Sequence, residues 1–249
     1  MNAPYRMSSL PRRGGRPWAI GLLAAMLLLG GCATGPDAHP RDPLEPYNRG
    51  MTRFNDGVDE AVLKPAATVY RAAVPDLVRT GVSNFFGNLR DLWSAVNAAL
   101  QLRPQAAVEN FMRFNLNTFL GLGGVLDIAS EAQMERDTTD FGQTLGRWGV
   151  PSGAYVVLPL LGPSTVRDSV GVVVDAVGDP VMGIDHVPSR NSLYALRVVE
   201  LRANLLRAGN LLDQAALDKY SFTRDAYLQR RDSQVRALRG ESDPKDDDE

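Results

Sequence analysis

Apolar residues recur at helical spacing along much of this 249-residue chain, and that periodicity is the feature that most constrains its fold. In the first run, hydrophobic side chains follow one another after three and four residues in alternation, at Leu44, Tyr47, Met51, Phe54 and Val58. This spacing aligns one apolar stripe along a helix. With 44% hydrophobic residues, the chain has enough apolar material for a sizeable core or for a surface that faces lipid.

Amphipathic runs continue as far as residue 120. Pro65 is expected to interrupt the first run, and Pro75 suits the first position of the next helix. A further run over 89–100 is expected to stop before Pro104, and another over 104–120 ends at a cluster of glycines. The polar faces of these runs are rich in neutral amides. We therefore predict an all-α fold of amphipathic helices.

The second half of the chain has a less uniform pattern. Between residues 140 and 167, glycines surround the apolar stretch 155–161, which predicts a Gly-rich loop or a short hairpin with an extended piece. Residues 170–177 are apolar nearly throughout, so periodicity alone does not distinguish helix from strand, and the helical neighbours favour a buried helix. Helices are predicted for 192–218 and 223–238.

The first 31 residues have the pattern of a signal peptide. They carry four arginines and no acid, and residues 18–31 are uncharged and mostly apolar. The strongly apolar part, 18–29, would rise about 18 Å as a helix, which is short of a hydrocarbon core about 30 Å thick. We therefore predict a cleaved signal peptide over 1–31 and not a membrane span.

Leu29-Gly30-Gly31-Cys32 ends this segment and resembles the lipobox of bacterial lipoproteins, in which the cysteine receives a diacylglycerol. Cys32 is the only cysteine, so it has no disulfide partner within the chain. Two or more acyl chains on Cys32 would hold the protein on a bilayer durably. Ala33, where an aspartate would direct a lipoprotein to the inner membrane, favours the outer membrane by resemblance to lipoprotein sorting. Residues 32–42 are then a lipidated tether.

The charge distribution excludes a nucleic-acid partner. Residues 32–249 carry 23 basic and 29 acidic side chains, whereas nucleic-acid binding needs a basic stripe. Six of the acids lie in the last nine residues, and such a block of like charge predicts a disordered acidic tail over 240–249. The helical domain is expected over 43–239.

Candidates for catalysis or metal binding are few. The two histidines are His39, in the tether, and His186, in a predicted loop, so neither a Ser-His-Asp triad nor a His-rich zinc site is expected. The triplet that begins at Asp140 spells a kinase magnesium motif, but no phosphate-binding loop precedes it. Asp137 and Asp140 are more typical of a helix cap or a turn. The sequence thus predicts no enzyme, no metal and no cofactor.

Amides and aromatic residues are over-represented on the same helices. One interpretation is a soluble bundle in which asparagines cap helices and form hydrogen bonds. The other is a lipid site, because a lipid needs a polar and an apolar surface side by side, and the predicted lipid anchor favours this second interpretation. The amides in question are Asn84, Asn88, Asn97, Asn110, Asn115 and Asn117.

Several motifs in order resemble the MlaA/VacJ phospholipid-transport lipoproteins of Gram-negative outer membranes, and together they cover most of residues 42–231. Pro46, inside the first motif, and the acidic tail depart from the family pattern. The matching segments are Asp42-Pro43-Leu44-Glu45 with Tyr47-Asn48-Arg49 and Phe54-Asn55; residues 79–86 and 88–91; Asp140-Phe141-Gly142-Gln143-Thr144-Leu145-Gly146 with Trp148-Gly149; residues 158–164 with Arg167-Asp168; and Tyr220-Ser221-Phe222 with Arg224-Asp225.

The resemblance implies a ring-like bundle of amphipathic helices embedded in one leaflet, the inner leaflet of the outer membrane, around a polar passage. It also implies association with a trimeric outer-membrane porin and transfer of phospholipid to a soluble periplasmic carrier. Helices suit that position because hydrocarbon offers no partner to backbone polar groups. Phospholipids misplaced in the outer leaflet would be removed through the passage, which would maintain the lipid asymmetry of the membrane.

The resemblance and the amide pattern together give a set of candidate site residues. Neutral amides can compensate a dehydrated head group without trapping it. The predicted passage residues are Asn48, Arg49, Phe54, Asn55, Asn84, Asn115 and Asn117. The predicted flexible channel loop contains Gly142, Gly146, Gly149, Gly153, Pro159 and Gly162, although plain turns would also account for these glycines.

Two other functions remain open at the level of sequence. A structural lipoprotein that scaffolds the envelope would leave outer-leaflet phospholipid unchanged when deleted. A lipid hydrolase would lose its activity on substitution of one Ser or Asp. The scarcity of histidine makes the hydrolase the weakest of the three.

Overall fold

The computed structural model describes residues 39–241. The predicted signal peptide, Cys32, most of the tether and residues 242–249 of the predicted tail lie outside the described residues. Gly240 has a left-handed backbone conformation (φ 73°) and ends the last helix at Arg239, as glycine commonly does after a helix. The predicted end of the helical domain therefore coincides with a helix terminus.

Helices dominate the described part of the chain, with one small hairpin among them. In chain order the elements are α2 (Glu45–Val58), the π-helix η1 (Asp59–Leu63), α3 (Lys64–Ala73), α4 (Asp76–Leu100), α5 (Pro104–Phe119), α6 (Ile128–Glu131), α7 (Phe141–Arg147), β1 (Tyr155–Leu158), β2 (Gly162–Thr165), α8 (Val166–Gly178), α9 (Val187–Ala215) and α10 (Lys219–Arg239).

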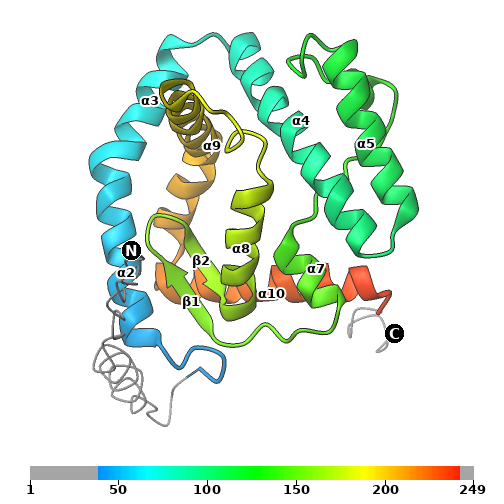
Figure 1. Ribbon diagram of the computed structural model, residues 1–249. Coiled ribbons are helices and arrows are strands. Elements are labelled where there is room, and N and C mark those ends of the chain that lie inside the picture. Colours follow the sequence, from blue (N-terminus) through cyan, green and yellow to red (C-terminus); the bar gives the residue numbers. More distant parts are fainter. Residues whose placement is uncertain (1–38, 242–249) are drawn as a thin grey trace, which may run out of the picture.

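The helices are arranged as a ring, which confirms the predicted fold class. In Figure 1, α2 and α3 form the left side, α4 and α5 form the right side, and α10 closes the base, while α8, α9 and the hairpin lie within this frame. Among residues 39–241, no helix combines the length and the apolar character that a membrane crossing needs.

The proline at residue 65 does not interrupt the first helix, contrary to the sequence prediction. α2 passes into η1, where the backbone N–H of Lys64 bonds to the carbonyl of Asp59, five residues back. Pro65 then lies in the first turn of α3. A π-turn loosens the hydrogen-bond ladder, and proline in a first turn has no N–H to leave unpaired. The chain therefore continues through the proline as one bent helical segment.

α4 and α5 pack against each other through polar residues. The two predicted runs at 75 and at 89–100 form the single helix α4, which turns into α5 at Leu102, a residue with positive φ (57°). Buried Asn88 of α4 donates to Thr118 of α5, whereas buried Asn97 accepts from Thr144 of α7 and buried Asn110 donates to the carbonyl of Asp137. By contrast, Phe111 and Phe119 of α5 point outward and are 51% and 78% exposed.

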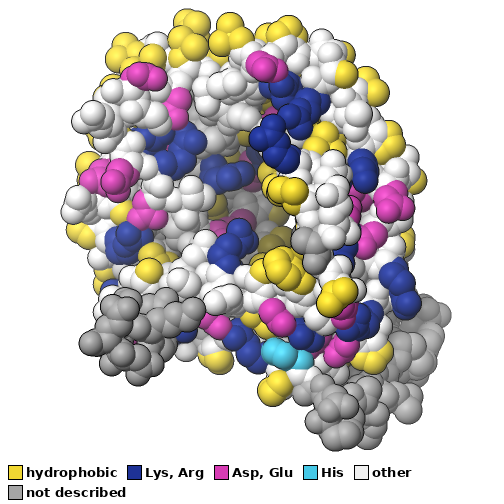
Figure 2. Space-filling model, turned by 180° about the vertical axis from the view of Figure 1, so that it is seen from behind, with side chains coloured by type: hydrophobic (Ala, Val, Ile, Leu, Met, Phe, Trp, Pro, Cys, Tyr) yellow, Lys and Arg dark blue, Asp and Glu magenta, His cyan; other side chains and the backbone are white. Residues whose placement is uncertain are grey.

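Many other large hydrophobic side chains are exposed on the outside of the molecule. On α8 the exposed set is Val166, Val170, Val172, Val173 and Val177, and on α9 it includes Val198, Leu201, Leu205 and Leu211. Residues 170–177 are thus helical as predicted, but the expectation that this helix is buried is wrong. Figure 2 shows hydrophobic side chains gathered along the upper and right edges of one face. Exposed apolar surface on this scale marks contact with a membrane or a partner.

The predicted Gly-rich loop begins later than expected. Residues 141–147 form α7, which Asp140 caps by accepting a hydrogen bond from the N–H of Gln143. The hairpin of β1 and β2 follows, in antiparallel register with Tyr155 opposite Thr165. Asp140 is therefore a helix cap, as its sequence context indicated. The core beneath the hairpin contains Tyr155, Val157, Tyr220 and Leu228.

Candidate functional site

A cavity of about 520 Å³ lies where α4, α8 and α9 meet the start of α7. Figure 2 shows the molecule hollowed near its middle, with basic and hydrophobic side chains on the rim. One part of the cavity wall is apolar and the other is polar. The apolar part contains Phe86, Leu89, Trp93, Leu161, Val172, Ala176 and Pro180, and the polar part contains Arg90, Thr138, Thr139, Asp140, Asp175, Asp179, Tyr194 and Arg197.

Arg197 and Asp179 form a charge-neutral pair in this wall. The two guanidinium NH groups donate to the carboxylate at 2.5 and 3.0 Å, and the hydroxyl of Tyr194 donates to the same carboxylate at 2.8 Å. Burial alone would raise the pKa of Asp179, but the hydrogen bonds from Arg197 and Tyr194 outweigh it and lower that pKa. Arg197 also lies over the ring of Phe86, 5.0 Å from its centroid. Its charge is therefore already engaged.

Asp175 is a carboxyl group at the cavity wall that forms no ion pair with any residue from 39 to 241. Burial raises its pKa, although it accepts hydrogen bonds from the indole N–H of Trp93 at 2.7 Å and from the backbone N–H of Phe141 at 2.9 Å. These two donors hold α8 against α4 and the start of α7. Asp175 thus holds the cavity wall together, and its burial makes the charged form of its carboxyl group less favourable.

Arg90 is the available cation of the cavity. It is exposed on α4, and it makes no ion pair with any residue between 39 and 241. A free guanidinium beside an apolar wall presents the two surfaces that a phospholipid requires, because the guanidinium can donate two hydrogen bonds to a phosphate.

The predicted passage residues Asn48 and Asn55 hold the hairpin against α2. Asn48 is fully buried, donates to Asp42 at 2.8 Å and to the Tyr155 carbonyl at 3.1 Å, and accepts from the Val157 N–H at 2.8 Å. Asn55 spans the hairpin turn, since its amide bonds the carbonyl of residue 158 and the N–H of residue 160. Neither amide is free for a lipid head group in this structure.

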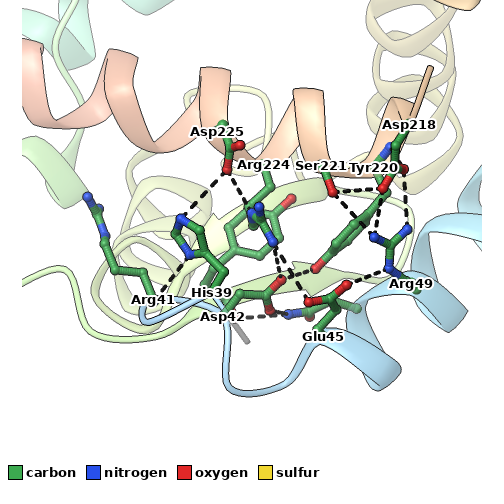
Figure 3. A network of polar contacts seen from close by, with 12 residues as sticks. His39, Arg41, Asp42, Glu45, Arg49, Asp218, Tyr220, Ser221, Arg224 and Asp225 are labelled. Atoms are coloured by element: carbon green, nitrogen blue, oxygen red, sulfur yellow. Dashed lines mark hydrogen bonds and ion pairs between the residues drawn. The ribbon is translucent and has the colours of Figure 1, made fainter. Parts of the chain in front are cut away.

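Arg49 and Phe54 flank these amides on α2. Arg49 pairs with Glu45 and Asp218, each at 2.7 Å, and its guanidinium lies 4.4 Å from the centroid of the Tyr220 ring. Phe54 is 52% exposed. Figure 3 shows how Arg49 and Asp42 join α2 and the preceding turn to the start of α10. In this network Asp42 accepts from the Tyr220 hydroxyl and from Arg224.

The other predicted amides occupy three different environments. Asn117 is buried and fixes the start of α6 by donating to Asp127 at 3.0 Å and accepting from the Ala129 N–H at 2.9 Å. Asn84 donates to the carbonyl of Val125 at 3.0 Å. Asn115 donates to a carbonyl of its own helix, four residues back. None of these three lines the 520 Å³ cavity.

The comparisons with known proteins agree on one family. The family model described as MlaA lipoprotein matches residues 40–234. This chain belongs to the MlaA lipoprotein family. It is 41% identical to MlaA of Shigella flexneri and to MlaA of Escherichia coli (strain K12), over 215 residues that cover 84% of this chain and 85% of each relative. Both are described as lipoproteins of the intermembrane phospholipid transport system.

A further relative and a solved structure support the assignment to the MlaA family. The MlaA protein of Haemophilus influenzae is 36% identical, with 83% of this chain and 86% of the relative covered. A solved structure, presented as the structural basis for maintenance of bacterial outer membrane lipid asymmetry, has a TM-score of 0.68 and 38% identity. It covers 78% of this chain and 98% of that chain.

In this MlaA-family chain, the predicted loop glycines divide into two groups. Gly142 and Gly146 are helical residues at close contacts, where a Cβ would approach the Arg231 guanidinium at 2.6 Å and the Val235 side chain at 2.7 Å, so their assignment to a flexible loop is corrected. Gly149, Gly153 and Gly162 have φ of 95°, 69° and 81° and supply turns around the hairpin, and Pro159 lies in the hairpin turn. A channel-loop role for these turn residues stays a prediction.

Sequence reasoning missed the residues that form the cavity wall. Asp175, Asp179 and Arg197 come from α8, the turn after it and α9, and only folding brings them next to α4. One signal was available for Arg90, because no acid stands three or four residues from it in either direction on its helix. Such an arginine lacks the usual partner on a helix surface.

Proposed function

We propose that this MlaA-family protein removes mislocalised phospholipids from the outer leaflet of the outer membrane and passes them inward, which maintains lipid asymmetry. The observation that carries the proposal is the 520 Å³ cavity with one apolar wall, one polar wall and the unpaired Arg90. The names of the relatives, which belong to an intermembrane phospholipid transport system, support the same function.

The lipid would move through the ring without covalent chemistry. A phosphate that leaves water loses hydrogen bonds at a cost of several kcal/mol unless new donors replace them. Arg90 supplies charged donors, and Thr138 supplies a neutral hydroxyl group on the same wall. The acyl chains would stay on Leu89, Trp93 and the valines of α8. Arg197 would contribute less, because Asp179 already neutralises it.

The predicted passage residues from α2 support the ring in this proposal. Asn48 and Asn55 fix the hairpin to α2, so their loss would affect transport through the shape of the ring. The predicted domain boundaries, with the signal peptide at 1–31 and the tether at 32–42, remain predictions.

We further propose that acylated Cys32 anchors the ring on the periplasmic side of the outer membrane, with its exposed apolar side chains in the inner leaflet. The short connection between Cys32 and the first described residue would keep the ring at the membrane. A Cys32→Ser protein should be found in the soluble periplasmic fraction or in mixed fractions, while the unmodified protein fractionates with the outer membrane. Equal membrane fractionation of the two would contradict the anchor.

A trimeric porin and a soluble phospholipid carrier are the proposed partners. The apolar exterior would lie against the lipid-facing band of a porin, and a carrier would receive lipid at the periplasmic mouth. Purification of the full acylated chain in a mild detergent should recover phospholipid and porin together. Recovery of neither would favour the structural scaffold.

The deciding experiment fills the cavity in a strain that depends on this protein. Ala176→Trp places a large side chain on the cavity wall, and Ala208→Trp places the same side chain on an exposed position of α9 that does not line it. Outer-leaflet phosphatidylethanolamine is measured with an amine reagent that does not cross membranes. We expect labelling to rise with Ala176→Trp to the level of a deletion strain and to stay low with Ala208→Trp. Unchanged labelling in the deletion strain would overturn the proposal.

A further inference from the structure

A basic groove lies outside the cavity, between α3 and α9. It has a volume of about 500 Å³, and its walls contain three cationic side chains: Lys64 and Arg71 from α3, and Arg207 from α9. In Figure 2, dark-blue side chains gather at the upper right, on the side to which the half-turn brings α3 and α9. The remaining lining residues are Thr68, Ala72, Leu206 and Asn210.

These three cations differ from the neighbouring Arg202. Arg202, which does not line the groove, is neutralised by Asp59, with bonds of 2.6 and 2.8 Å. Lys64, Arg71 and Arg207 make no ion pair with any residue in the described part of the chain. The nearby carboxylate of Asp213 is already bound to Lys219 at 2.9 Å. The groove therefore carries a net positive charge, although Lys64 lies close enough to Asp213 to lower the pKa of that carboxyl group.

The position of the cations on α3 follows from helix geometry. At about 100° per residue, Lys64, Thr68 and Arg71 share one face. Ala67, which is buried with Ala203 and Leu206 of α9, lies on one side of that face. Val69, which is 66% exposed, lies on the other side. The helical segment thus presents a packed face, a cationic face and an outward apolar face in that order.

α9 continues the same arrangement across the groove. Arg207 and Asn210 lie on the groove side of the helix, and Leu211 beside them is 61% exposed. Cations flanked by exposed valine and leucine side chains are typical of helices that lie at a membrane surface, where the apolar residues enter the acyl region and the cations meet lipid phosphates.

We propose that this groove binds the phosphate of a membrane phospholipid head group, at a site separate from the cavity. Two guanidinium groups and one ammonium group line the groove, whose volume of about 500 Å³ admits a phosphate, and the apolar flanks would accept the start of the acyl chains. The site would hold the ring at a fixed depth and tilt in the leaflet. It does not depend on lipid transport, because the groove and the cavity share no lining residue.

Two sets of substitutions separate this site from the cavity. Lys64→Gln/Arg71→Gln/Arg207→Gln removes the charge of the groove but keeps side chains of similar length. Arg53→Gln/Arg190→Gln/Arg230→Gln removes the same charge at positions that have no ion pair in the described part of the chain and do not line the groove. Ala176→Trp fills the cavity and leaves the groove unchanged. The single variant Arg207→Gln serves if the groove triple variant does not fold.

The full acylated chain is purified in a neutral maltoside detergent, and bound dioleoyl phosphatidylglycerol is counted by native mass spectrometry during a titration. We expect the groove variant to lose one binding event or to weaken it by roughly tenfold or more. The charge-matched control should keep that event, as should Ala176→Trp. Binding of this phosphatidylglycerol molecule should weaken as the salt concentration rises, because salt screens the attraction between exposed charges.

Two further titrations identify what the groove recognises. Dioleoylglycerol has the same acyl chains but no phosphate, and it should not produce the event. Inorganic phosphate should compete only weakly, because it lacks the chains that contact the apolar flanks. The proposal is overturned if the groove variant binds phosphatidylglycerol as the unmodified chain does, if dioleoylglycerol binds equally well, or if inorganic phosphate competes as strongly as the lipid.

Discussion

The guanidinium of Arg231, in the second half of α10, donates to both carboxylate oxygens of Asp140, at 2.7 and 2.9 Å. Asp140 caps α7 and also lines the cavity. Arg231 reaches a second carboxylate, that of Asp168 at the start of α8, through a bond of 3.0 Å. One buried arginine thus joins the base of the ring to two helices beside the cavity.

Replacing Arg231 should therefore destabilise the whole base of the ring. Arg231→Gln leaves the buried carboxylate of Asp168 without its main partner, and breaking a buried ion pair in this way costs about 3–5 kcal/mol. Arg230→Gln, at the exposed neighbouring position, should cost less than about 0.5 kcal/mol. Thermal unfolding in detergent, followed by circular dichroism, measures both. Equal melting temperatures would show that the Arg231 network does not support the fold.

The amides on α2 and α5 offer a second matched comparison. Asn48→Ala removes three hydrogen bonds and leaves buried polar groups of the hairpin unpaired, at a cost of about 1–3 kcal/mol for each unsatisfied group. Asn115→Ala removes one bond to its own helix and replaces a weak helix former with a strong one. We expect a clear loss of stability for the first variant and little or none for the second. A similar loss of stability for both variants would mean that Asn48 does not hold the hairpin against α2.

The sequence predicted the helices well because their apolar stripes are long and regular. Those stripes did not reveal which side of each helix faces the protein. In α5, Asn110, Arg113 and Asn117 are buried while Phe111 and Phe119 are exposed, which reverses the usual arrangement in water. Residues 170–177 were expected to be buried for the same reason: an apolar run is equally compatible with a protein core and with lipid.

The cavity was beyond the reach of sequence reasoning for a different reason. Its walls come from α4, α8 and α9, and the contact of Trp93 with Asp175 spans 82 positions of the chain. Asparagines near aromatic residues suggested a lipid passage. However, an amide that lines a passage and an amide that holds a hairpin through hydrogen bonds can have the same local sequence. Only the partners of each amide distinguish the two roles.

Replacing glycine by alanine should have opposite effects on the stability of the fold in α2 and in α8. In α2, a Cβ at Gly50 or Gly57 meets nothing within 4 Å, so Gly50→Ala and Gly57→Ala should each stabilise the helix by up to about 1 kcal/mol. At Gly178 a Cβ would overlap the ring of Trp93, and such overpacking typically costs about 1–3 kcal/mol. Melting temperatures should rise in the first case and fall in the second. A rise with Gly178→Ala would show that Trp93 can move freely.

Asp175 should make the stability of the fold depend on pH. Its pKa is raised above the ordinary value of 3.8, chiefly by burial, so the folded chain binds this proton more tightly than the unfolded chain does. The contribution to stability is therefore complete below pH 3.8 and is lost as the pH rises through the raised pKa. Asp175→Asn keeps an oxygen to accept from Trp93 but carries no charge. We expect this variant to melt higher than the unmodified chain at pH 7, with a difference that shrinks toward pH 4. A constant difference would mean that burial of Asp175 does not penalise its charge.

The outward phenylalanines test the reversed arrangement of α5 most directly. Phe111 and Phe119 are largely exposed, whereas Phe86 is 5% exposed and packs inside the ring. Phe86→Ser should therefore lower the melting temperature strongly, since loss of a buried aromatic side chain costs about 3–5 kcal/mol. Phe111→Ser/Phe119→Ser removes little packing within the protein, so its melting temperature should change little, while the mass of bound detergent and the insertion into vesicles should fall. Light scattering with refractive-index detection measures the detergent mass. The contrary outcome is a double variant that binds as much detergent as the unmodified chain but unfolds more easily. In that case the two rings pack against protein and not against acyl chains, and the membrane position proposed for α5 is wrong.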